Sequence, residues 1–371
     1  MRAAAALLAL IAGCTGIVVP GAARAEEGRF YGMLRERDLS PFGFLRLDMR
    51  PAHAVSIEPH SFAIEMELGY QNTWALSPNV EKFLTSRESA GRHDLGPADI
   101  EAIRNLPGEN YLVDLESATL DVGVHYKLSS QWTLYGFATW VSYQGGFMDS
   151  SIEQFHDAVG FSSFGRPAVA RNQANIVLDL KGAQVTLLNV PETQGFTDPI
   201  FGLRYGGIDL PGRWDMSVEV ATKVPLEGER MLLSTGHTDY GMQASVRHLG
   251  SRNAVHVDLS AVYYAGESMP VPQDEQIVPT VVIGWEHQMT ARTNFNLQGY
   301  ASRSVYTHEQ TDLDDLLDDK YQLSLGIRHR FDCCLVSFGV TENLQNLNNT
   351  PDIGFQLGFA WLPALAPQRQ D

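Results

Sequence analysis

The sequence predicts an all-β fold, a transmembrane antiparallel β-barrel of about 12 strands with long extracellular loops. Three observations lead to this prediction. Hydrophobic and polar residues alternate through much of the chain between residues 62 and 361. One of the two alternating faces is almost free of charge, and the connections between the alternating segments are short and long in turn.

The alternation is clearest in residues 62–74. Successive side chains of a strand point to opposite faces, so the even and odd positions lie on different sides. The even positions hold Phe62, Ile64, Met66, Leu68, Tyr70, Asn72 and Trp74. Similar segments lie at 118–128, 214–224, 240–246, 255–263, 281–285, 295–297, 321–327 and 353–361. Three less regular ones, at 132–143, 199–208 and 334–341, bring the number to twelve.

The apolar face of the regular segments is nearly uncharged, with Arg303 at a segment end as the exception. A cation on the lipid face of a barrel costs roughly 2–4 kcal/mol at the bilayer midplane, so such a face should lack charge. The opposite face is then the lumen wall. We expect it to carry Glu65, Glu67, Asp121, Lys127, Asp215, Glu219, Lys223, Arg247, Asp258, Glu286, Arg328 and Arg330.

A soluble β-sandwich also alternates, with the apolar face as its core. The segment lengths favour the barrel, because they run to about 10–13 residues where globular strands have roughly 5–6. Aromatic residues near the segment ends resemble the two interfacial girdles of a barrel. They are Phe62, Trp74, Tyr126, Trp132, Trp214, Tyr240, Tyr263, Tyr321, Phe331 and Trp361.

The connection lengths predict the orientation. Short turns at 129–131, 209–212, 250–252, 290–292 and 332–333 alternate with long connections such as 75–117 and 144–198. Outer-membrane barrels have short periplasmic turns and longer extracellular loops. With the first strand rising from the periplasm, every short turn is periplasmic and the last strand ends there. The tail is 362–371.

The amino terminus predicts export. Residues 1–25 combine Arg2, an apolar run, Pro20 and the small-residue triplet that ends at Ala25, as a cleavable signal peptide does. An alternative is acylation at Cys14 in a lipoprotein-like box. Removal of these residues would leave 25 basic and 44 acidic residues. That balance argues against nucleic acid as a partner. The expected partners are outer-membrane lipids with lipopolysaccharide, and the secretion and barrel-assembly machinery.

Residues 26–61 precede the first strand and form either a periplasmic segment or a plug in the lumen. The two longest loops each contain a helical pattern, at 149–161 and after Pro97. These helices are either surface elements or, for the first, a constriction in the barrel mouth that would include Phe155 and His156. Twelve strands lie between a filled eight-stranded barrel and an open sixteen-stranded one, so a narrow or plugged lumen is expected.

Two blocks of sequence resemble a known family. One runs from Arg37-Asp38-Leu39-Ser40-Pro41-Phe42-Gly43 through Arg46-Leu47-Asp48 to Asn72-Thr73-Trp74, and the other contains Gly145-Gly146-Phe147, Ile152-Glu153-Gln154-Phe155-His156 and Gly165-Arg166. They are similar to the proteobacterial outer-membrane β-barrel family catalogued as domain of unknown function 3187. The resemblance implies a barrel and an outer-membrane location, without a substrate or catalytic residues. It suggests a hypothesis in which both blocks plug the lumen, with Arg37, Asp38, Arg46 and Asp48 meeting charges of the wall.

The sequence offers little for catalysis or metal binding. Pairs such as His237 with Asp239 and His256 with Asp258 lack a nucleophile at a recognisable spacing. His53 and His60 near Glu58 lack a further metal ligand nearby. We therefore expect no enzyme, no cofactor and no metal. Cys333 and Cys334 are adjacent and are expected to be packed or paired thiols near a turn.

The function that the sequence favours is a channel or transporter for small solutes, working by passive or gated diffusion. If Phe137 or Trp140 faced inward, the channel could instead carry a hydrophobic solute. The alternatives are a structural barrel whose long loops bind a partner and, third, an outer-membrane enzyme. The mixed signs of the lumen charges predict mutual neutralisation or a transverse field that orients a polar solute.

Overall fold

A computed structural model describes residues 29–38, 43–53, 57–160, 162–190, 193–266, 275–345 and 349–362. The predicted signal peptide at 1–25, with Cys14, and most of the tail lie outside these residues. None of the described helices is long and apolar enough to cross a membrane.

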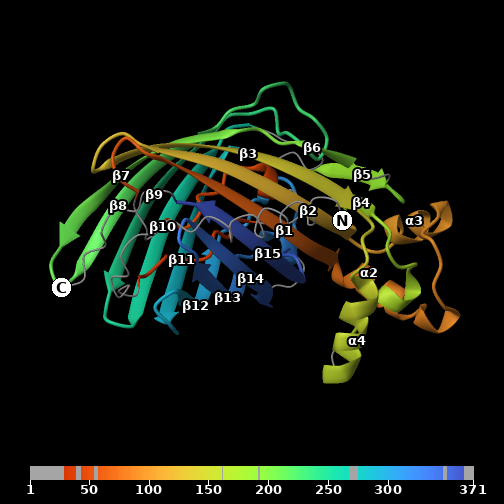
Figure 1. Cartoon of the computed structure of the whole chain (residues 1–371). Helices are drawn as coiled ribbons and strands as arrows, with labels where there is room; N and C mark the ends of the chain where they lie inside the picture. The colour runs from red at the N-terminus through yellow and green to blue at the C-terminus, as the bar shows by residue number, and fades with distance from the viewer. Residues whose placement is uncertain are drawn as a thin grey trace.

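Twelve long strands of the described chain close into an antiparallel β-barrel (Figure 1). They are β1 (Phe62–Leu76), β2 (Asn110–Lys127), β3 (Trp132–Gln144), β7 (Ile200–Leu210), β8 (Trp214–Lys223), β9 (Asp239–Leu249), β10 (Asn253–Tyr264), β11 (Gln276–Gln288), β12 (Thr293–Ser302), β13 (Lys320–Arg330), β14 (Cys334–Gln345) and β15 (Ile353–Trp361). Each pairs with the next, and β1 pairs with both β2 and β15, so the sheet has no free edge across the membrane. The predicted fold class and strand number are confirmed.

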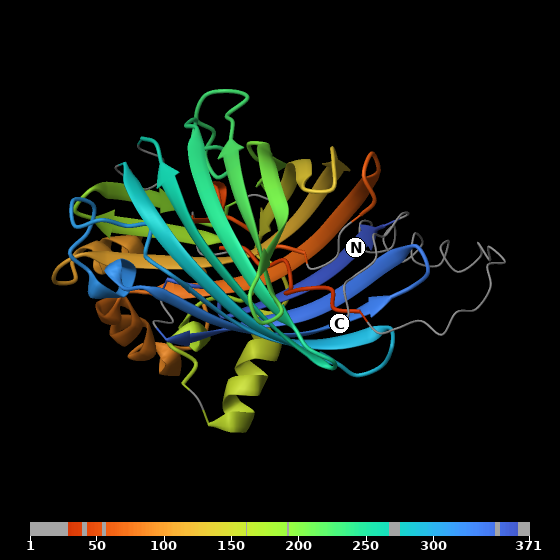
Figure 2. The ribbon, with the colours of Figure 1, turned by 90° about the vertical axis from the view of Figure 1, so that its left-hand side faces the viewer.

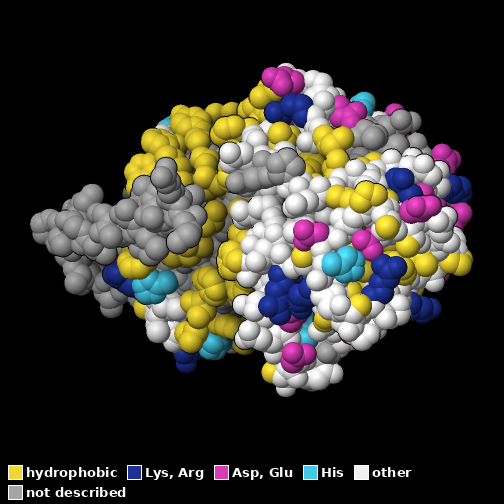
Figure 3. Space-filling model, turned by 90° about the vertical axis from the view of Figure 1, so that its right-hand side faces the viewer, with side chains coloured by type: hydrophobic (Ala, Val, Ile, Leu, Met, Phe, Trp, Pro, Cys, Tyr) yellow, Lys and Arg dark blue, Asp and Glu magenta, His cyan; other side chains and the backbone are white. Residues whose placement is uncertain are grey.

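The apolar side of the strands faces outward, as expected. Val220 is 52% exposed and Leu325 is 46% exposed, although both lie in the middle of their strands. The alternate residues, such as Glu65 and Gln71 of β1, are buried inside the barrel. In Figure 3, hydrophobic side chains cover one part of the visible face and charged side chains are spread over another part. An apolar outer surface of this extent fits contact with hydrocarbon.

The prediction that Trp74 belongs to an aromatic girdle at the membrane surface is wrong. Trp74 is only 6% exposed, and its indole nitrogen donates a hydrogen bond to the carbonyl oxygen of Phe164 at 2.9 Å. The reason is that β1 and β2 extend beyond the barrel, where the loop that contains Phe164 covers their outer side. Other predicted girdle residues are exposed, for example Tyr126, Trp132 and Tyr240.

The long loops build a cap on the end opposite the short turns. It contains α2 (Pro78–Thr85), α3 (Pro97–Arg104), α4 (Asp149–Val159) and α5 (Asp314–Leu317), with the short 3-10 helices η3 (Glu88–Ala90) and η4 (Arg166–Ala168). It also contains β4 (Asn175–Leu180), β5 (Ala183–Leu187) and β6 (Thr193–Phe196). The β4–β5 hairpin pairs with the extension of β2, and β6 pairs with the end of β3.

The helical patterns at 149–161 and after Pro97 are present as α4 and α3, whereas the strands of the cap were missed. Ile176, Val177 and Leu178 of β4 are all buried. A strand that is covered on both faces reads as a continuous apolar run, without the alternation that marks the barrel strands. The buried apolar residues of the cap form a core that includes Leu76, Leu84, Ile103 and Val177.

Candidate functional site

The lumen contains a part of the chain that precedes β1. We call residues 29–38 and 43–53 the inner segment; it contains the short 3-10 helix η2 (Gly43–Leu45). Figure 2 shows this segment, in red, inside the ring of strands. A β-bridge between Gly32 and His53 is antiparallel. The segment is therefore a hairpin with a first leg at 29–38 and a second leg at 43–53, whose two ends lie near the short-turn mouth.

Polar side chains of β11 to β13 hold the first leg. The carboxylate of Glu286 accepts the backbone N–H groups of Tyr31 at 2.7 Å and Gly32 at 3.0 Å. Nη1 of Arg328 donates to the carbonyl oxygens of Tyr31 at 2.9 Å and Met33 at 2.8 Å. The amide oxygen of Gln298 accepts the N–H of Leu34 at 2.8 Å. Side chains of the wall thus supply hydrogen bonds to the backbone groups of the first leg, which forms no β-ladder with the wall strands.

Two acids of the wall, in the half of β1 and β2 nearer the short turns, pair with arginines of the inner segment. Glu65 of β1 lies 2.9 Å from Nε of Arg35. Asp121 of β2 lies 3.2 Å from Arg37 and 2.7 Å from Arg50, so it receives one arginine from each leg. The wall charges are therefore neutralised by the inner segment, and not only by one another across the lumen.

A second group of charges holds the hairpin near the cap. Asp239 of β9 lies 2.9 Å from Nζ of Lys223 and 3.9 Å from Arg46, and it accepts the N–H of Leu47 at 3.0 Å. Lys320 of β13 pairs with Asp38. The carboxylate of Asp48 accepts the N–H of Asp38, which joins the two legs. All of these side chains are buried.

Glycines of the wall make room for the inner segment at two places. A Cβ at Gly284 of β11 would lie 2.5 Å from Cγ of Met33, and a Cβ at Gly326 of β13 would lie 2.7 Å from Cδ1 of Leu34. Real Cβ atoms do not approach so closely, so the first leg fits the wall only because these residues lack a side chain. The fit between the hairpin and the lumen is therefore steric as well as electrostatic.

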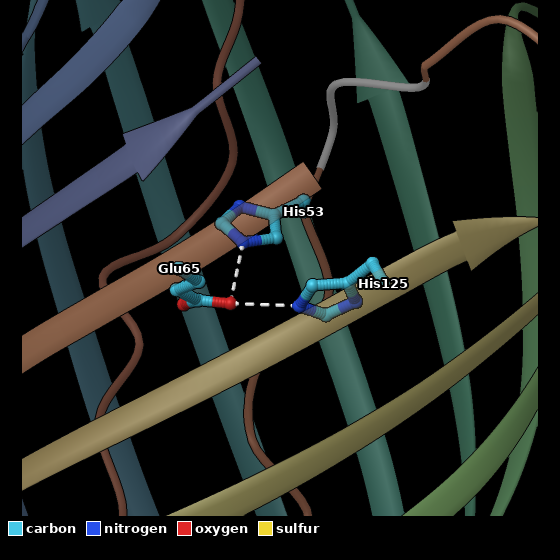
Figure 4. A group of neighbouring side chains, drawn as sticks. All are labelled: His53, Glu65 and His125. Atoms are coloured by element: carbon cyan, nitrogen blue, oxygen red, sulfur yellow. Dashed lines mark hydrogen bonds and ion pairs between the residues drawn. The ribbon is translucent and has the colours of Figure 1, made fainter. Parts of the chain in front are cut away.

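Three side chains meet where the second leg leaves the lumen (Figure 4). Oε2 of Glu65 lies 3.2 Å from Nε2 of His53 and 3.0 Å from Nε2 of His125. His53 belongs to the inner segment, while Glu65 and His125 belong to β1 and β2. One carboxylate oxygen thus links the hairpin to two neighbouring wall strands.

The three ligand atoms of this cluster lie within 4.8 Å of one another, a spacing that a metal ion could use. Their neighbours favour a hydrogen-bonded network instead. Nη2 of Arg328 lies 3.4 Å from Nδ1 of His53, so that nitrogen accepts and Nε2 carries the proton toward Glu65. A divalent cation here would also face the guanidinium groups of Arg35 and Arg328, whose charge opposes it.

Burial changes the titration of the inner segment. It raises the pKa of Glu36 to about 8, and hydrogen bonds from Gln298 and Thr341 oppose this change only in part. Burial also lowers the pKa of His53 to about 3, against the opposing effect of Glu65. At neutral pH, Glu36 is therefore mostly protonated and His53 is neutral.

The twelve charged residues predicted for the lumen wall lie on the inward side of their strands. Nine of them are buried, and Asp215, Arg247 and Arg330 are half-buried near the short turns. Phe137 points inward, with Arg50 4.5 Å from its ring centre, whereas Trp140 lies on the alternate face. His256 and Asp258 serve structural contacts, to Glu286 and to the N–H of Ala52.

Of the residues predicted as a plug or constriction, Arg37, Asp38, Arg46 and Asp48 lie in the lumen with buried side chains. The prediction is wrong for Phe155, which is 58% exposed on α4. Figure 1 shows α4 projecting away from the barrel. His156 contacts Phe164 of the cap and lines a surface cavity there. An amphipathic helix pattern shows which face is covered, but not whether the lumen or the cap covers it.

The second family block lies in the cap, at the end of the barrel opposite the short turns. It meets the Asn72 end of the first block there, and it does not join the inner segment in the lumen. Arg166 is buried there and contacts Asp149 at 2.8 Å and Asn72 at 2.7 Å, and it also pairs with Asp352. Glu116 accepts the N–H groups of Phe147 and Met148. This block ties the longest loop to β1 and β2.

Sequence reasoning missed Arg35, Arg50 and Lys320 as lumen residues. The inward direction of His125 followed from its alternation with the apolar residues of β2, but its contact with Glu65 did not. Arg35 and Arg50 lie in a segment without regular structure, where no periodicity indicates direction. Cys333 and Cys334 form no disulfide within the described residues; Cys334 begins β14 and is buried, while Cys333 is half-buried in the turn before it.

Comparisons with known proteins agree with this architecture. The family model described as "Protein of unknown function (DUF3187)" matches residues 105–361, which include the second block but not the first. No curated protein matches the chain.

Three solved outer-membrane proteins share the barrel at low identity. The COG4313 outer membrane channel from Pseudomonas putida F1 is 10% identical, with a TM-score of 0.49 over 84% of this chain and 97% of that one. The P. putida toluene transporter TodX is 10% identical (TM-score 0.38, 82% and 90% covered). The CymD monoaromatic hydrocarbon channel is 11% identical (TM-score 0.37, 82% and 89% covered). These likenesses carry no argument about function.

Proposed function

Because the chain belongs to the DUF3187 family, whose description assigns no activity, we propose a function from the barrel itself. The protein is a gated channel of the bacterial outer membrane for small solutes, and the inner segment is its movable closure. Export by a signal peptide at residues 1–25 and contact with lipopolysaccharide through the cap belong to the same proposal.

The observation that carries the proposal is how the inner segment is attached. Each hydrogen bond and ion pair described above between this segment and the wall uses a side chain of the wall. The wall strands, by contrast, are joined by continuous ladders such as β1–β2. Side-chain contacts can break and re-form one at a time, whereas a strand cannot leave a ladder without exposing its whole backbone. The hairpin can therefore move while the barrel stays closed.

The lumen favours solutes with a polar group. Its wall carries acids, bases and amides, and the aromatic rings of Tyr135 and Phe137 are the apolar part near mid-height. Two barrels that share the fold at low identity are the CymD monoaromatic hydrocarbon channel and the toluene transporter TodX. For this chain we propose amphipathic solutes, in which an apolar body carries a charged or polar end.

A structural barrel whose cap binds a partner is the second candidate. The buried Arg166, held between Asp149, Asn72 and Asp352, favours it, because this network gives the longest loop a fixed shape. A fixed cap is what a binding surface needs, but it does not explain a charged hairpin in the lumen. We rank this function below the channel for that reason.

Conductance across a planar lipid bilayer tests the proposal. The purified mature protein should give small or intermittent currents, and a variant that lacks residues 29–53 should give larger and steadier ones. Phe155→Ala, on the exposed side of α4, is the control and should behave as the parent protein. Absence of current from the deletion variant, in a barrel that still migrates as folded before boiling, would contradict the channel.

A further inference from the structure

A cavity of about 170 Å³ lies at the short-turn mouth of the barrel, beside the place where the inner segment leaves the lumen. His53 and Ile57 line it from the chain that leads to β1, and Lys127, Arg204 and Arg247 line it from β2, β7 and β9. One buried water needs roughly 10–15 Å³ by a comparable measure, so this volume has room for a small organic molecule. The two mouth arginines and the lysine give one side of the cavity a positive character.

Lys127 is the unusual residue of this cavity. It is the last residue of β2 and only 7% exposed, yet its ammonium group has no hydrogen-bond or ion-pair partner among the described residues. The charged groups whose fields act on it are the guanidinium groups of Arg204 and Arg247, which are also cations. Lys127 is thus largely shielded from water and lies beside two other cations, so an anion in this cavity would gain a direct ion pair.

The acids near the cavity are already committed to other cations. Glu219 lies 2.5 Å from Nε of Arg204, and Asp215 lies 2.5 Å from Nε of Arg247. Glu65 is shared by Arg35, His53 and His125. Each arginine is thus balanced by an acid, while Lys127 adds one positive charge that the wall does not balance. A ligand with a single negative charge fits this excess.

The other side of the cavity is apolar. Ile57, Ala63, Ala360 and Leu362 line it, and they offer a ligand contact surface without hydrogen-bonding groups. A fully hydrated inorganic anion would gain nothing from this surface. An organic anion would bury its apolar body there and place its charged end at Lys127.

We propose that this cavity is a binding site for a small monocarboxylate with an apolar body, with its carboxylate paired to Lys127. The inference deepens the proposed function, since it names the chemical class of solute that the channel would pass at its periplasmic mouth. The arginines act as flanking positive charges and Lys127 forms the direct ion pair.

Isothermal titration of the full mature protein in detergent tests this proposal, with benzoate as the probe. Benzoate should bind, and Lys127→Gln should weaken binding by about tenfold or more, which corresponds to about 1.4 kcal/mol. Lys127→Arg should retain most of the affinity, which separates loss of charge from loss of fold. Lys181→Gln is the control, because Lys181 pairs with Asp312 on the cap, far along the barrel.

Two further probes define the ligand class. Benzamide, which has the same body without charge, should not bind. Inorganic phosphate should bind more weakly than benzoate, and phosphate binding that equals or exceeds it would overturn the monocarboxylate assignment. Equal benzoate affinity in Lys127→Gln and parent protein, or no benzoate binding at millimolar concentration, would overturn the site.

The binding measurement does not depend on conduction. Benzoate binding in a protein whose deletion variant passes no current would keep the site and remove the channel. Conduction without benzoate binding would keep the channel and remove the site.

Discussion

Strand β2 and the second leg of the inner segment differ in how they are held inside one barrel. β2 pairs with β1 in unbroken register from Tyr126 to Leu112, so its backbone groups are satisfied by a ladder. The second leg relies on single side chains such as Asp239, Asp258 and Gln243. The comparison shows that burial alone does not fix an element in the barrel; a backbone ladder holds it more firmly than single side-chain contacts do. The wall should respond to changes on its lipid face, and the hairpin to changes of a few buried charges.

The largest expected effect is at Asp239. Asp239→Ala removes the carboxylate shared by Lys223, Arg46 and the N–H of Leu47, and so takes the nearest counter-charge from two buried cations. Breaking a buried pair in this way costs about 3–5 kcal/mol. We expect the second leg to leave the lumen. Trypsin should then cleave after Arg46 in the folded barrel, as read by mass spectrometry.

The matched control is Asp332→Ala, because Asp332 lies 3.1 Å from Arg292 in an exposed pair at a short turn. Exposed pairs contribute about 0–1 kcal/mol, so cleavage should stay at the parent rate. Parent-like protection of Arg46 in Asp239→Ala would show that the hairpin does not depend on this charge.

The second effect concerns the wall. Val220→Arg places a cation on the lipid face in the middle of β8 and should cost roughly 2–4 kcal/mol in unfolding from lipid vesicles. Trypsin protection of the inner segment should not change. Phe155→Arg, on exposed α4, should leave the unfolding free energy within about 0.5 kcal/mol of the parent value. Equal costs for both substitutions would contradict a hydrocarbon-facing wall.

A smaller effect is expected at Glu286, which accepts the N–H groups of Tyr31 and Gly32. Glu286→Gln keeps the shape but removes the charge, and hydrogen bonds to charged groups contribute about 1.5–3 kcal/mol. The first leg should become accessible to trypsin at Arg35, while Arg46 in the second leg stays protected. Simultaneous release of both legs would mean that the hairpin moves as one unit. Glu101→Gln, on exposed α3, is the control.

The smallest effect is a pH dependence set by Glu36. Its pKa rises from an ordinary value of 4.5 to about 8 in the lumen, because burial favours the neutral acid. The stability that it gives the inserted hairpin is full below pH 4.5 and is lost as the pH rises toward 8; over the single unit from pH 7 to pH 8, in which the effect is measured, the loss is about 1 kcal/mol. Trypsin access to the first leg should increase over this range.

Glu36→Gln has no proton to lose, so its part of this pH dependence should disappear. Thr341 Oγ1, which donates to Glu36 at 3.0 Å, can still donate to the amide oxygen. His53 works in the opposite sense, since its lowered pKa favours the inserted state above about pH 6.5. The difference in trypsin access between the parent protein and Glu36→Gln, measured at each pH, isolates the contribution of the Glu36 carboxyl group. A constant difference from pH 5 to pH 8 would contradict its assigned role.

The barrel could be predicted from sequence because its physical cause is periodic. A strand between lipid and a polar lumen should alternate, and nine of the twelve wall strands carry that pattern clearly, while β3, β7 and β14 carry it less regularly. The helices α3 and α4 were predicted for the same reason, with a different period. Strands β4 and β5 were not, because the cap covers Ile176, Val177 and Leu178 alike.

The lumen was predictable only in part. The charges of the wall followed from the alternation, and the charges at Arg37, Asp38, Arg46 and Asp48 stood out as a cluster before the first strand. Their partners did not follow, because Asp121 is 84 residues from Arg37 in the chain, and register alone cannot place an irregular segment. The His53–Glu65–His125 cluster joins three segments for which no shared sequence pattern exists.

The central claim is that the hairpin closes the lumen and leaves it when the channel opens. Arg35→Cys with Glu65→Cys tests this most directly, in a background with serine at positions 333 and 334, because Nε of Arg35 lies 2.9 Å from Oε1 of Glu65, so a short linker can replace the two side chains. Solute flux into vesicles should fall when a cleavable bis-maleimide joins the two cysteines and return when the linker is cut. Equal flux in the linked and the cut protein would show that solutes pass without movement of the hairpin, and would contradict the account.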